Sequence, residues 1–473
     1  MGFVLQIGLQ LMIRNNTLMW LYHSLMRDRR FLQRIIVIAA VFFLTTVLGL
    51  KTSTFQTKLV FGFLGGILAV LAFLRWPSLG LIVVCVGGMV IPYSGPGGVN
   101  AIFPLVALLL CLWLLDMLVR ERQIRLVASR TMWPLLAFMA ASATSFVSGQ
   151  LPWFTFAKQA PLVDQLGGFS IYILSACAFL LVANRVRDIT WLKAITWTFV
   201  ALAVIYVALS IFPETAGILK TVFQKTGSLF WIWLVAMAFS QLVINRDLPA
   251  RWRLALLCIV LATLYVLFFQ RFDQKSGWLP VIVTMVAIIS IRYWRAGLVL
   301  AVGVALSSWK LSSFILEAEQ YSLTTRVEAW VIMAQIIRVN PVFGMGFSNY
   351  YWITPLFSIL GWNVQFNSHN NYIDILAQTG LVGLAFFAWF ILEVGRLAWR
   401  LRAGTPEGFA RAYVYGALGG LLGTIVAGML GDWVLPFVYN IGLDGFRISV
   451  LAWIFLGGLV VLDQIYTRPP TAA

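Results

Sequence analysis

Apolar stretches of about 15 to 22 residues recur along the whole chain, separated by short polar connections. Each stretch is close to the ~20 residues that a helix needs to cross the hydrocarbon core of a bilayer. Lipid offers no partner for backbone polar groups, so such stretches must be helices, whose backbone hydrogen bonds are all internal. The pattern predicts an all-α fold: a polytopic bundle of transmembrane helices with a large, partly helical extracytoplasmic loop late in the chain.

The expected spans number 12 to 14, because the stretch 77–92 is rich in glycine and the stretch 296–308 is short. Their approximate bounds are 35–50, 59–74, 77–92, 101–119, 132–147, 168–183, 191–212, 228–244, 254–269, 278–291, 296–308, 373–395, 412–430 and 447–463.

Composition agrees with this pattern. Of 473 residues, 61% are hydrophobic and 11% charged, and the mean hydropathy is +0.90, whereas a soluble domain has about 25% charged residues. The net charge of +17 could indicate nucleic-acid binding. However, about two-thirds of the Lys and Arg residues fall in alternate connections, and the positive-inside rule places those connections in the cytoplasm. We therefore expect a multi-pass protein of the cytoplasmic (inner) membrane with both termini in the cytoplasm.

This topology divides the chain into five parts. Residues 1–34 form a cytoplasmic or interfacial segment, 35–308 and 373–463 form transmembrane helices, and 464–473 form a cytoplasmic tail. Residues 309–372 form an extracytoplasmic loop long enough to fold, with aromatic and leucine side chains throughout. Loops held by a rigid scaffold are where function concentrates, so we expect the active site in this loop.

The loop has a readable plan. Thr325 and Glu328 make a capping-box pattern, which predicts that a helix begins there. The helix should end near Asn340, because Pro341 disfavours helical geometry in the residue before it. Gly344 and Gly346 should then turn the chain.

His369, at the exit of the loop, is the leading candidate for proton transfer. It precedes an expected helix N-terminus, whose positive dipole end favours the neutral, proton-accepting imidazole. An interfacial histidine bonded to a backbone carbonyl explains the same position equally well. No cysteine or paired carboxylate stands beside it, so we expect no metal site and no cofactor. Ionisable residues are almost absent from the middle of the spans, which weakens the case for an ion-coupled transporter.

Three cations are candidates for binding a diphosphate. Arg326 stands in the loop, and Arg271 and Lys275 stand in a short outer connection. A guanidinium forks onto phosphate oxygens with charge-assisted hydrogen bonds. The alternative for each is a cation that remains in solvent or binds lipid headgroups.

Residues 271 to about 395 resemble the O-antigen ligase and O-antigen polymerase superfamily. The run TTRVEAWVIMAQIIRVNPVFGMGFSNY is similar to its Arg, Trp, Pro, Gly-x-Gly signature, and SHNNYIDILAQTGLVGL is similar to its second signature. The loop signature residues are Trp330, Pro341, Gly344, Gly346, Asn370 and Gly380. We expect Gly380 and Gly383, three residues apart on the helix that follows the loop, to be close-packing positions.

The resemblance implies a metal-independent membrane glycosyltransferase of the C-type architecture, which acts in polysaccharide and lipopolysaccharide biosynthesis of the cell envelope. Its donor would be an undecaprenyl-diphosphate-linked glycan. Its acceptor would be a hydroxyl of a lipid core, a glycan or a protein, and transfer would take place at the outer face of the cytoplasmic membrane. His369 takes the place of the proposed base and Arg326 that of an arginine on the diphosphate.

Two positions depart from the family pattern. Lys275 or Arg271 must replace an arginine that usually stands in a Ser-Arg-Gly context, and Gln378 stands where the family often has Glu. Ligase and polymerase remain alternatives, and so does a lipid-linked glycan flippase.

Overall fold

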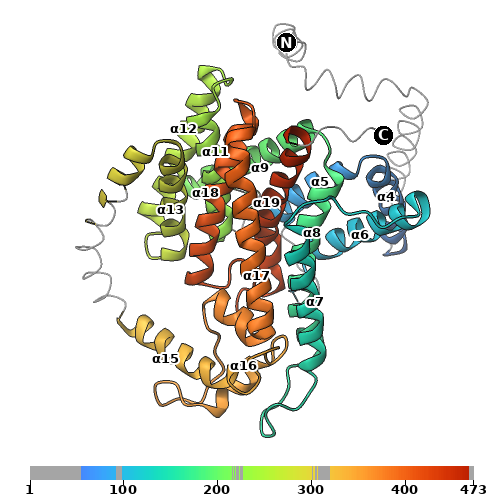
Figure 1. Ribbon diagram of the computed structural model, residues 1–473, viewed down its shortest axis with the longest axis vertical. Coiled ribbons are helices and arrows are strands. Elements are labelled where there is room, and N and C mark those ends of the chain that lie inside the picture. Colours follow the sequence, from blue (N-terminus) through green and yellow to red (C-terminus); the bar gives the residue numbers. More distant parts are fainter. Residues whose placement is uncertain are drawn as a thin grey trace. The chain divides into compact units, whose positions relative to one another are not determined.

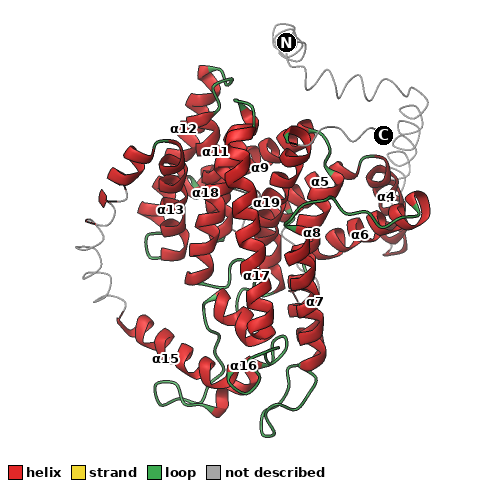
Figure 2. Cartoon of the chain, viewed as in Figure 1, coloured by secondary structure: helices red, strands yellow, loops and turns green. Residues whose placement is uncertain are grey.

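The computed structural model describes residues 55–91, 98–215, 217, 219, 223, 227–300, 302–303, 306 and 320–467. Within these residues every regular element is a helix, and an isolated β-bridge joins Ile359 and Trp362 (Figure 2). Backbone contacts divide the chain into two compact units, Met1–Leu79 and Gly80–Ala473. The expected N-terminal segment 1–34, the span 35–50 and the start of the loop, 309–319, lie outside the described residues.

The helices of the first half are α4 (Phe55–Arg75), α5 (Pro77–Val90), α6 (Ile102–Leu115) with η2 (Asp116–Glu121), α7 (Met132–Ser148), α8 (Leu162–Arg185), α9 (Ile189–Ile211) and η3 (Pro213–Thr215). Those of the second half are α11 (Ser228–Ile244), α12 (Ala250–Tyr265) with η4 (Val266–Gln270), α13 (Lys275–Arg292), α15 (Gln320–Ile337), α16 (Tyr350–Ile353), η5 (Thr354–Leu356), α17 (Asn371–Gly404), α18 (Phe409–Leu430), η6 (Leu443–Gly445) and α19 (Phe446–Tyr466).

Among the described residues, 8 helices are long and apolar enough to cross a membrane, and further apolar helices are shorter. Each of the expected spans from 59–74 to 278–291 and from 373–395 to 447–463 coincides with one of these helices. Most of the expected span 296–308 lies outside the described residues. The chain is an integral membrane protein, as the sequence predicts.

α18 and α19 form the centre of the second unit. In the most apolar 18-residue stretch of the helix Leu443–Tyr466, 94% of the residues are buried, against 28% in that of Ala250–Gln270. Glycines bring α18 close to its neighbours: a Cβ on Gly423 would lie only 2.9 Å from the Pro280 carbonyl oxygen of α13. Small residues permit such an approach in a membrane, where packing drives helix association.

From α7 onward, consecutive membrane helices of the second unit run in alternate directions, so their connections gather at two ends (Figure 1). One end carries α16 and residues 357–370, and we call it the loop end. The other we call the arginine end, because Arg-rich connections meet there. At the arginine end Arg185 pairs with Asp116 (2.8 Å) and Arg400 with Asp463 (2.9 Å). The segregation of basic residues away from the loop agrees with the charge distribution along the sequence.

The loop helix begins earlier than the sequence predicts. α15 spans Gln320–Ile337, so Thr325 lies inside the helix and the expected capping box is wrong. Glu328 instead accepts a hydrogen bond from the backbone N–H of Leu360 at 3.1 Å. The capping-box prediction failed because residues three apart share one face anywhere along a helix. The spacing Thr-x-x-Glu therefore does not distinguish a helix start from a helix interior.

Gly380 is a close-packing position, as expected, and α17 is interrupted there, with φ 66° and ψ −171°. Residues 341–346 dock against the interruption: Met345 N–H donates to the Ala377 carbonyl (2.8 Å), and Leu381 N–H donates to the Pro341 carbonyl (2.8 Å). Non-helical backbone at this depth is tolerated because it is buried in protein, where its polar groups find partners.

Glycine is required on both sides of this contact. Gly344, at φ 71°, turns the chain as predicted, and a Cβ on it would lie 2.7 Å from the Ala377 carbonyl oxygen. A Cβ on Gly380 would overlap the Val342 carbonyl. Only glycine combines a left-handed backbone with this approach of two main chains. We call the contact between residues 341–346 and residues 377–382 the glycine junction.

Candidate functional site

His369 stands in a tight turn immediately before α17. Its φ of 49° lies in the left-handed region, where histidine is enriched but non-glycine residues remain uncommon, at a cost of order 1–3 kcal/mol. The side chain of Asn370 caps the helix by accepting hydrogen bonds from the N–H groups of Tyr372 (3.0 Å) and Ile373 (3.4 Å). The exposed imidazole therefore lies at the positive end of the α17 dipole, as predicted.

α15 presents Arg326 and Trp330 to this turn. Trp330 Nε1 donates to the Ser368 carbonyl at 2.9 Å, beside His369. Arg326 is four residues earlier and so lies on the same helix face. Its Nη1 donates to the Leu430 carbonyl at 3.5 Å, the one hydrogen bond that it makes among the described residues. A guanidinium has five N–H donors, so most of the donors of Arg326 remain available for a ligand.

Asp432 is a residue of this site that sequence reasoning missed. It lies just after α18, is 1% exposed, and accepts hydrogen bonds from Phe437 N–H (2.9 Å) and Asn440 Nδ2 (2.6 Å). Burial raises its pKa above the usual range, although these hydrogen bonds and nearby His369 oppose the shift. A carboxylate directly after a span, on the same side as His369, was the available signal.

Three effects act on the pKa of His369. Loss of water around the ring lowers the pKa below 6.5, the Asp432 carboxylate opposes this, and the Arg326 guanidinium lowers the pKa further. The side chain is solvent-exposed at its outer edge, yet its protein neighbours exclude enough water for the lowering effects to dominate. The imidazole is therefore largely neutral near pH 7, the form that accepts a proton.

Lys275 and Arg271 lie at the same end of the bundle, on its α11–α13 side. Lys275 opens α13, and the Arg271 guanidinium packs over the Trp231 ring at 5.7 Å. α13 runs antiparallel to α18, with Pro280 beside Gly423. Counting ~1.5 Å per residue from that contact brings the start of α13 to the level of the end of α18, where Arg326 reaches Leu430.

Further contacts connect the segment around Lys275 to Asp432. A Cβ on Gly227, which precedes α11, would lie 3.1 Å from the ring of Trp433, the neighbour of Asp432. The next residue, Ser228, donates through its hydroxyl to the Ser276 carbonyl, the neighbour of Lys275. The structure thus brings His369, Arg326, Trp330 and Asn370 together directly, and places the two other cations across the end of α18.

Apart from Asp432, these site residues come from the part of the chain that runs from α11 to the start of α17. Residues 234–388 match the family model of O-antigen ligase. This stretch is similar to an O-antigen ligase domain. This domain, about a third of the chain, contains both signature runs, all three candidate cations and His369. No curated protein sequence matches the chain.

The signature residues of the O-antigen ligase domain divide into two groups. Trp330 and Asn370 hold the His369 turn through a carbonyl and a helix cap. Pro341, Gly344 and Gly380 belong to the glycine junction, which fixes the path of the chain below that turn. Gly346, with φ 78°, continues the same junction through its N–H bond to the Gln378 carbonyl (3.1 Å).

Across the part of the chain that the structure describes, no group of three or more His, Cys, Asp and Glu side chains could hold a metal ion. The groups of the site that can meet negative charge are the cations Arg326, Arg271 and Lys275. Guanidinium groups bind phosphate oxygens in a bidentate way, so the site is chemically suited to an anionic ligand with a nearby proton acceptor.

Proposed function

We propose that this membrane protein is a glycosyltransferase that moves a glycan from an undecaprenyl-diphosphate-linked donor to an acceptor hydroxyl. The O-antigen ligase domain supports lipid-linked glycan chemistry. The observation that carries the proposal is the placement of Arg326 and His369 around one turn at the loop end. An anion-binding group and a proton acceptor are the two functions that this transfer needs.

In the proposed reaction the acceptor oxygen attacks the anomeric carbon of the glycan. The bond from that carbon to the phosphate oxygen breaks, and the diphosphate leaves with the electron pair. Arg326, with Lys275 and Arg271 across the end of α18, stabilises the charge that develops on the diphosphate. His369 takes the proton of the attacking hydroxyl and returns it to solvent. Cations can supply the charge stabilisation here, so we propose that the reaction needs no metal.

The proposed topology places the loop end outside the cytoplasm and both termini inside. It is supported by the arginine end, where basic connections gather, because cytoplasmic connections are rich in Lys and Arg. In this division residues 309–372 form the extracytoplasmic loop between the transmembrane parts 35–308 and 373–463. The acceptor would be a lipid core, another glycan chain or a protein, and it would reach the site at the outer face of the cytoplasmic membrane.

The test is a transfer assay with the purified full chain. A labelled undecaprenyl-diphosphate glycan is supplied with lipid-core, glycan and protein acceptors, in EDTA and in Mg²⁺. We expect labelled product at equal rates in both buffers, with His369→Ala as the inactive reference. Movement of the labelled donor across a vesicle membrane, with every acceptor unmodified, would replace this proposal with a lipid-linked glycan flippase. A rate that requires Mg²⁺ would overturn its metal-independent part.

A further inference from the structure

Asp374, in the first turn of α17, is a buried carboxylate for which the proposed reaction has no role. It is 0% exposed. Its Oδ1 accepts hydrogen bonds from Tyr350 Oη (2.6 Å) and Ser368 Oγ (2.7 Å), whereas its Oδ2 has no hydrogen-bond partner among the described residues. Burying a carboxylate with unmet acceptor capacity is unfavourable. Helix capping does not explain it, because Asn370 already caps α17.

The contacts of Asp374 join segments that build the site. Ser368 immediately precedes His369, and its Oγ also accepts the N–H of Asn370 (3.0 Å), the residue that follows. Tyr350, on α16, stacks on Phe437 with ring centroids 4.7 Å apart. Phe437 in turn donates its N–H to Asp432. Asp374 is therefore the common partner of the His369 turn and of the aromatic contact that supports Asp432.

Asp374 competes with a backbone carbonyl for the proton of the Ser368 hydroxyl. The Ser368 hydroxyl lies within hydrogen-bonding distance of both Asp374 Oδ1 (2.7 Å) and the Asn370 carbonyl (2.9 Å), but it has one proton to donate. Asp374 Oδ1 is the nearer acceptor, so the Ser368 proton is directed to it while the Ser368 oxygen accepts the Asn370 N–H. The hydrogen bond from Asn370 N–H to Ser368 Oγ thus joins the residues on either side of His369.

We propose that Asp374 is a positioning residue for glycan transfer, which holds His369 in its left-handed conformation through Ser368 and fixes Asp432 beside it through Tyr350 and Phe437. This inference rests on the proposed function, because it assigns Asp374 a role in the same reaction. Asp374 is buried below the turn and touches neither substrate, so its effect passes through His369. The diphosphate contacts of Arg326 do not depend on it.

The kinetic test compares Asp374→Asn with Asp463→Asn in the full chain. Asp463 is a matched control, since it is also buried (1% exposed) but pairs with Arg400 at the arginine end. A base misplaced by about 1 Å can lose on the order of 100-fold in rate. We expect kcat to fall about 10- to 100-fold in Asp374→Asn with the KM for the lipid donor within about threefold of wild type. Asp463→Asn should keep both values.

A double-mutant cycle separates positioning from a general loss of structure. Ser368→Ala should reduce kcat as Asp374→Asn does, and the double variant should be no slower than the worse single variant, because both changes break one connection. Multiplicative losses, or a raised KM with unchanged kcat, would overturn the inference. So would wild-type kcat in a folded Asp374→Asn protein.

A measurement on His369 itself does not depend on catalysis. The chain has 2 histidines, so a His23→Gln background leaves His369 as the one imidazole signal in an NMR spectrum of histidine-labelled protein. Asp374→Asn and Ser368→Ala should shift or broaden that signal, and Asp463→Asn should leave it unchanged. If wild type transfers no glycan while these shifts occur, the proposed function fails and the positional link survives. If Asp374→Asn leaves the signal unchanged, the link is wrong whatever the activity.

Discussion

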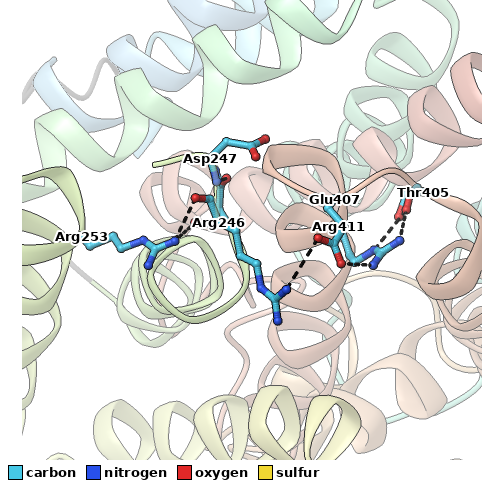
Figure 3. Close-up of polar contacts among 7 residues, drawn as sticks. Arg246, Asp247, Arg253, Thr405, Glu407 and Arg411 are labelled. Atoms are coloured by element: carbon cyan, nitrogen blue, oxygen red, sulfur yellow. Dashed lines mark hydrogen bonds and ion pairs between the residues drawn. The ribbon is translucent and has the colours of Figure 1, made fainter. Parts of the chain in front are cut away.

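Glu407 at the arginine end and the pair Asp374 and Asp432 at the loop end have different kinds of hydrogen-bonding partner. At the arginine end Glu407 pairs with Arg411 at 2.9 Å and approaches Arg246 at 4.0 Å (Figure 3). At the loop end Asp374 and Asp432 are buried, and their hydrogen bonds come from neutral donors: two hydroxyl groups, a backbone N–H and an amide. Glu407 therefore has cationic partners, whereas Asp374 and Asp432 accept hydrogen bonds from neutral groups. A paired carboxylate occurs at the loop end too, where Asp444 pairs with Arg447.

Exposure accounts for the small contribution of the Glu407 pairs, whereas the Arg400–Asp463 pair at the same end has a buried carboxylate. The Arg246 and Glu407 side chains are 66% and 52% exposed, and exposed pairs contribute only about 0–1 kcal/mol. The Arg246–Glu407 pair links the α11–α12 connection to the α17–α18 connection and contributes little free energy. A carboxylate paired with Arg326 would neutralise the guanidinium before a substrate reached it. The loop end also holds buried carboxyl groups whose hydrogen bonds come from neutral donors, Asp374 and Asp432, and perturbed ionisable groups of this kind cluster at functional sites.

The largest expected effect is the loss of the base. His369→Ala should lower kcat by about 10²- to 10⁴-fold, the usual contribution of a positioned general base. The measurement is glycan transfer under single-turnover conditions, with His23→Ala as a control of the same residue type. A His369→Ala protein with wild-type turnover would mean that the loop end is as structural as the arginine end.

Stability should depend on the glycine junction. Gly380→Ala forces a left-handed alanine into the Val342 carbonyl, and we expect a loss of about 2 to 5 kcal/mol from backbone strain and overpacking. Gly395→Ala, later in α17, is the control, because its Cβ would make an ordinary contact of 3.7 Å with Leu421. Thermal unfolding in detergent should show a lower midpoint only for the first variant. Equal midpoints would show that the junction is not under tight constraint.

The availability of Arg326 can be tested against Arg338, which directly follows the same helix. Charge-assisted hydrogen bonds contribute about 1.5 to 3 kcal/mol, so Arg326→Ala should lower kcat/KM by about 10- to 100-fold. Arg326→Lys should recover only part of this loss, since an ammonium cannot bind in a bidentate way. Exposed Arg338→Ala should behave as wild type. Equal effects at both positions would reduce Arg326 to a general contribution to surface charge.

The pH dependence tests the charges around His369. Activity requires the neutral imidazole, so kcat/KM should fall as pH drops through the pKa of His369, which lies below 6.5. Asp432 raises that pKa and Arg326 lowers it. Asp432→Asn should therefore move the acid limb to lower pH, and Arg326→Ala should move it to higher pH. Shifts in the same direction would contradict the arrangement.

The smallest effect is expected at the arginine end. Glu407→Gln removes the partner of Arg411 and Arg246, yet both guanidinium groups remain near water. The loss of stability should be at most about 1 kcal/mol, with unchanged kcat and KM in the transfer assay. A large loss of activity there would show that the two ends are coupled through the bundle.

The sequence alone determined that the fold is a bundle of membrane helices, where most spans lie, and that His369 and Arg326 belong to the same loop. These features depend on local hydrophobicity, on the fixed length needed to cross a bilayer and on motifs within one segment. The turns at Gly344 and Gly346 and the helix start after Asn370 followed from local chemistry in the same way.

Only the tertiary structure decided the rest. It placed Asp432, about 60 residues beyond His369 in the chain, beside the imidazole, and it showed that Gly380 interrupts a helix because another main chain docks there. It also moved the start of α15 away from the apparent capping box. Each of these features depends on contacts between segments far apart in the sequence, and local periodicity and spacing carry no information about such contacts.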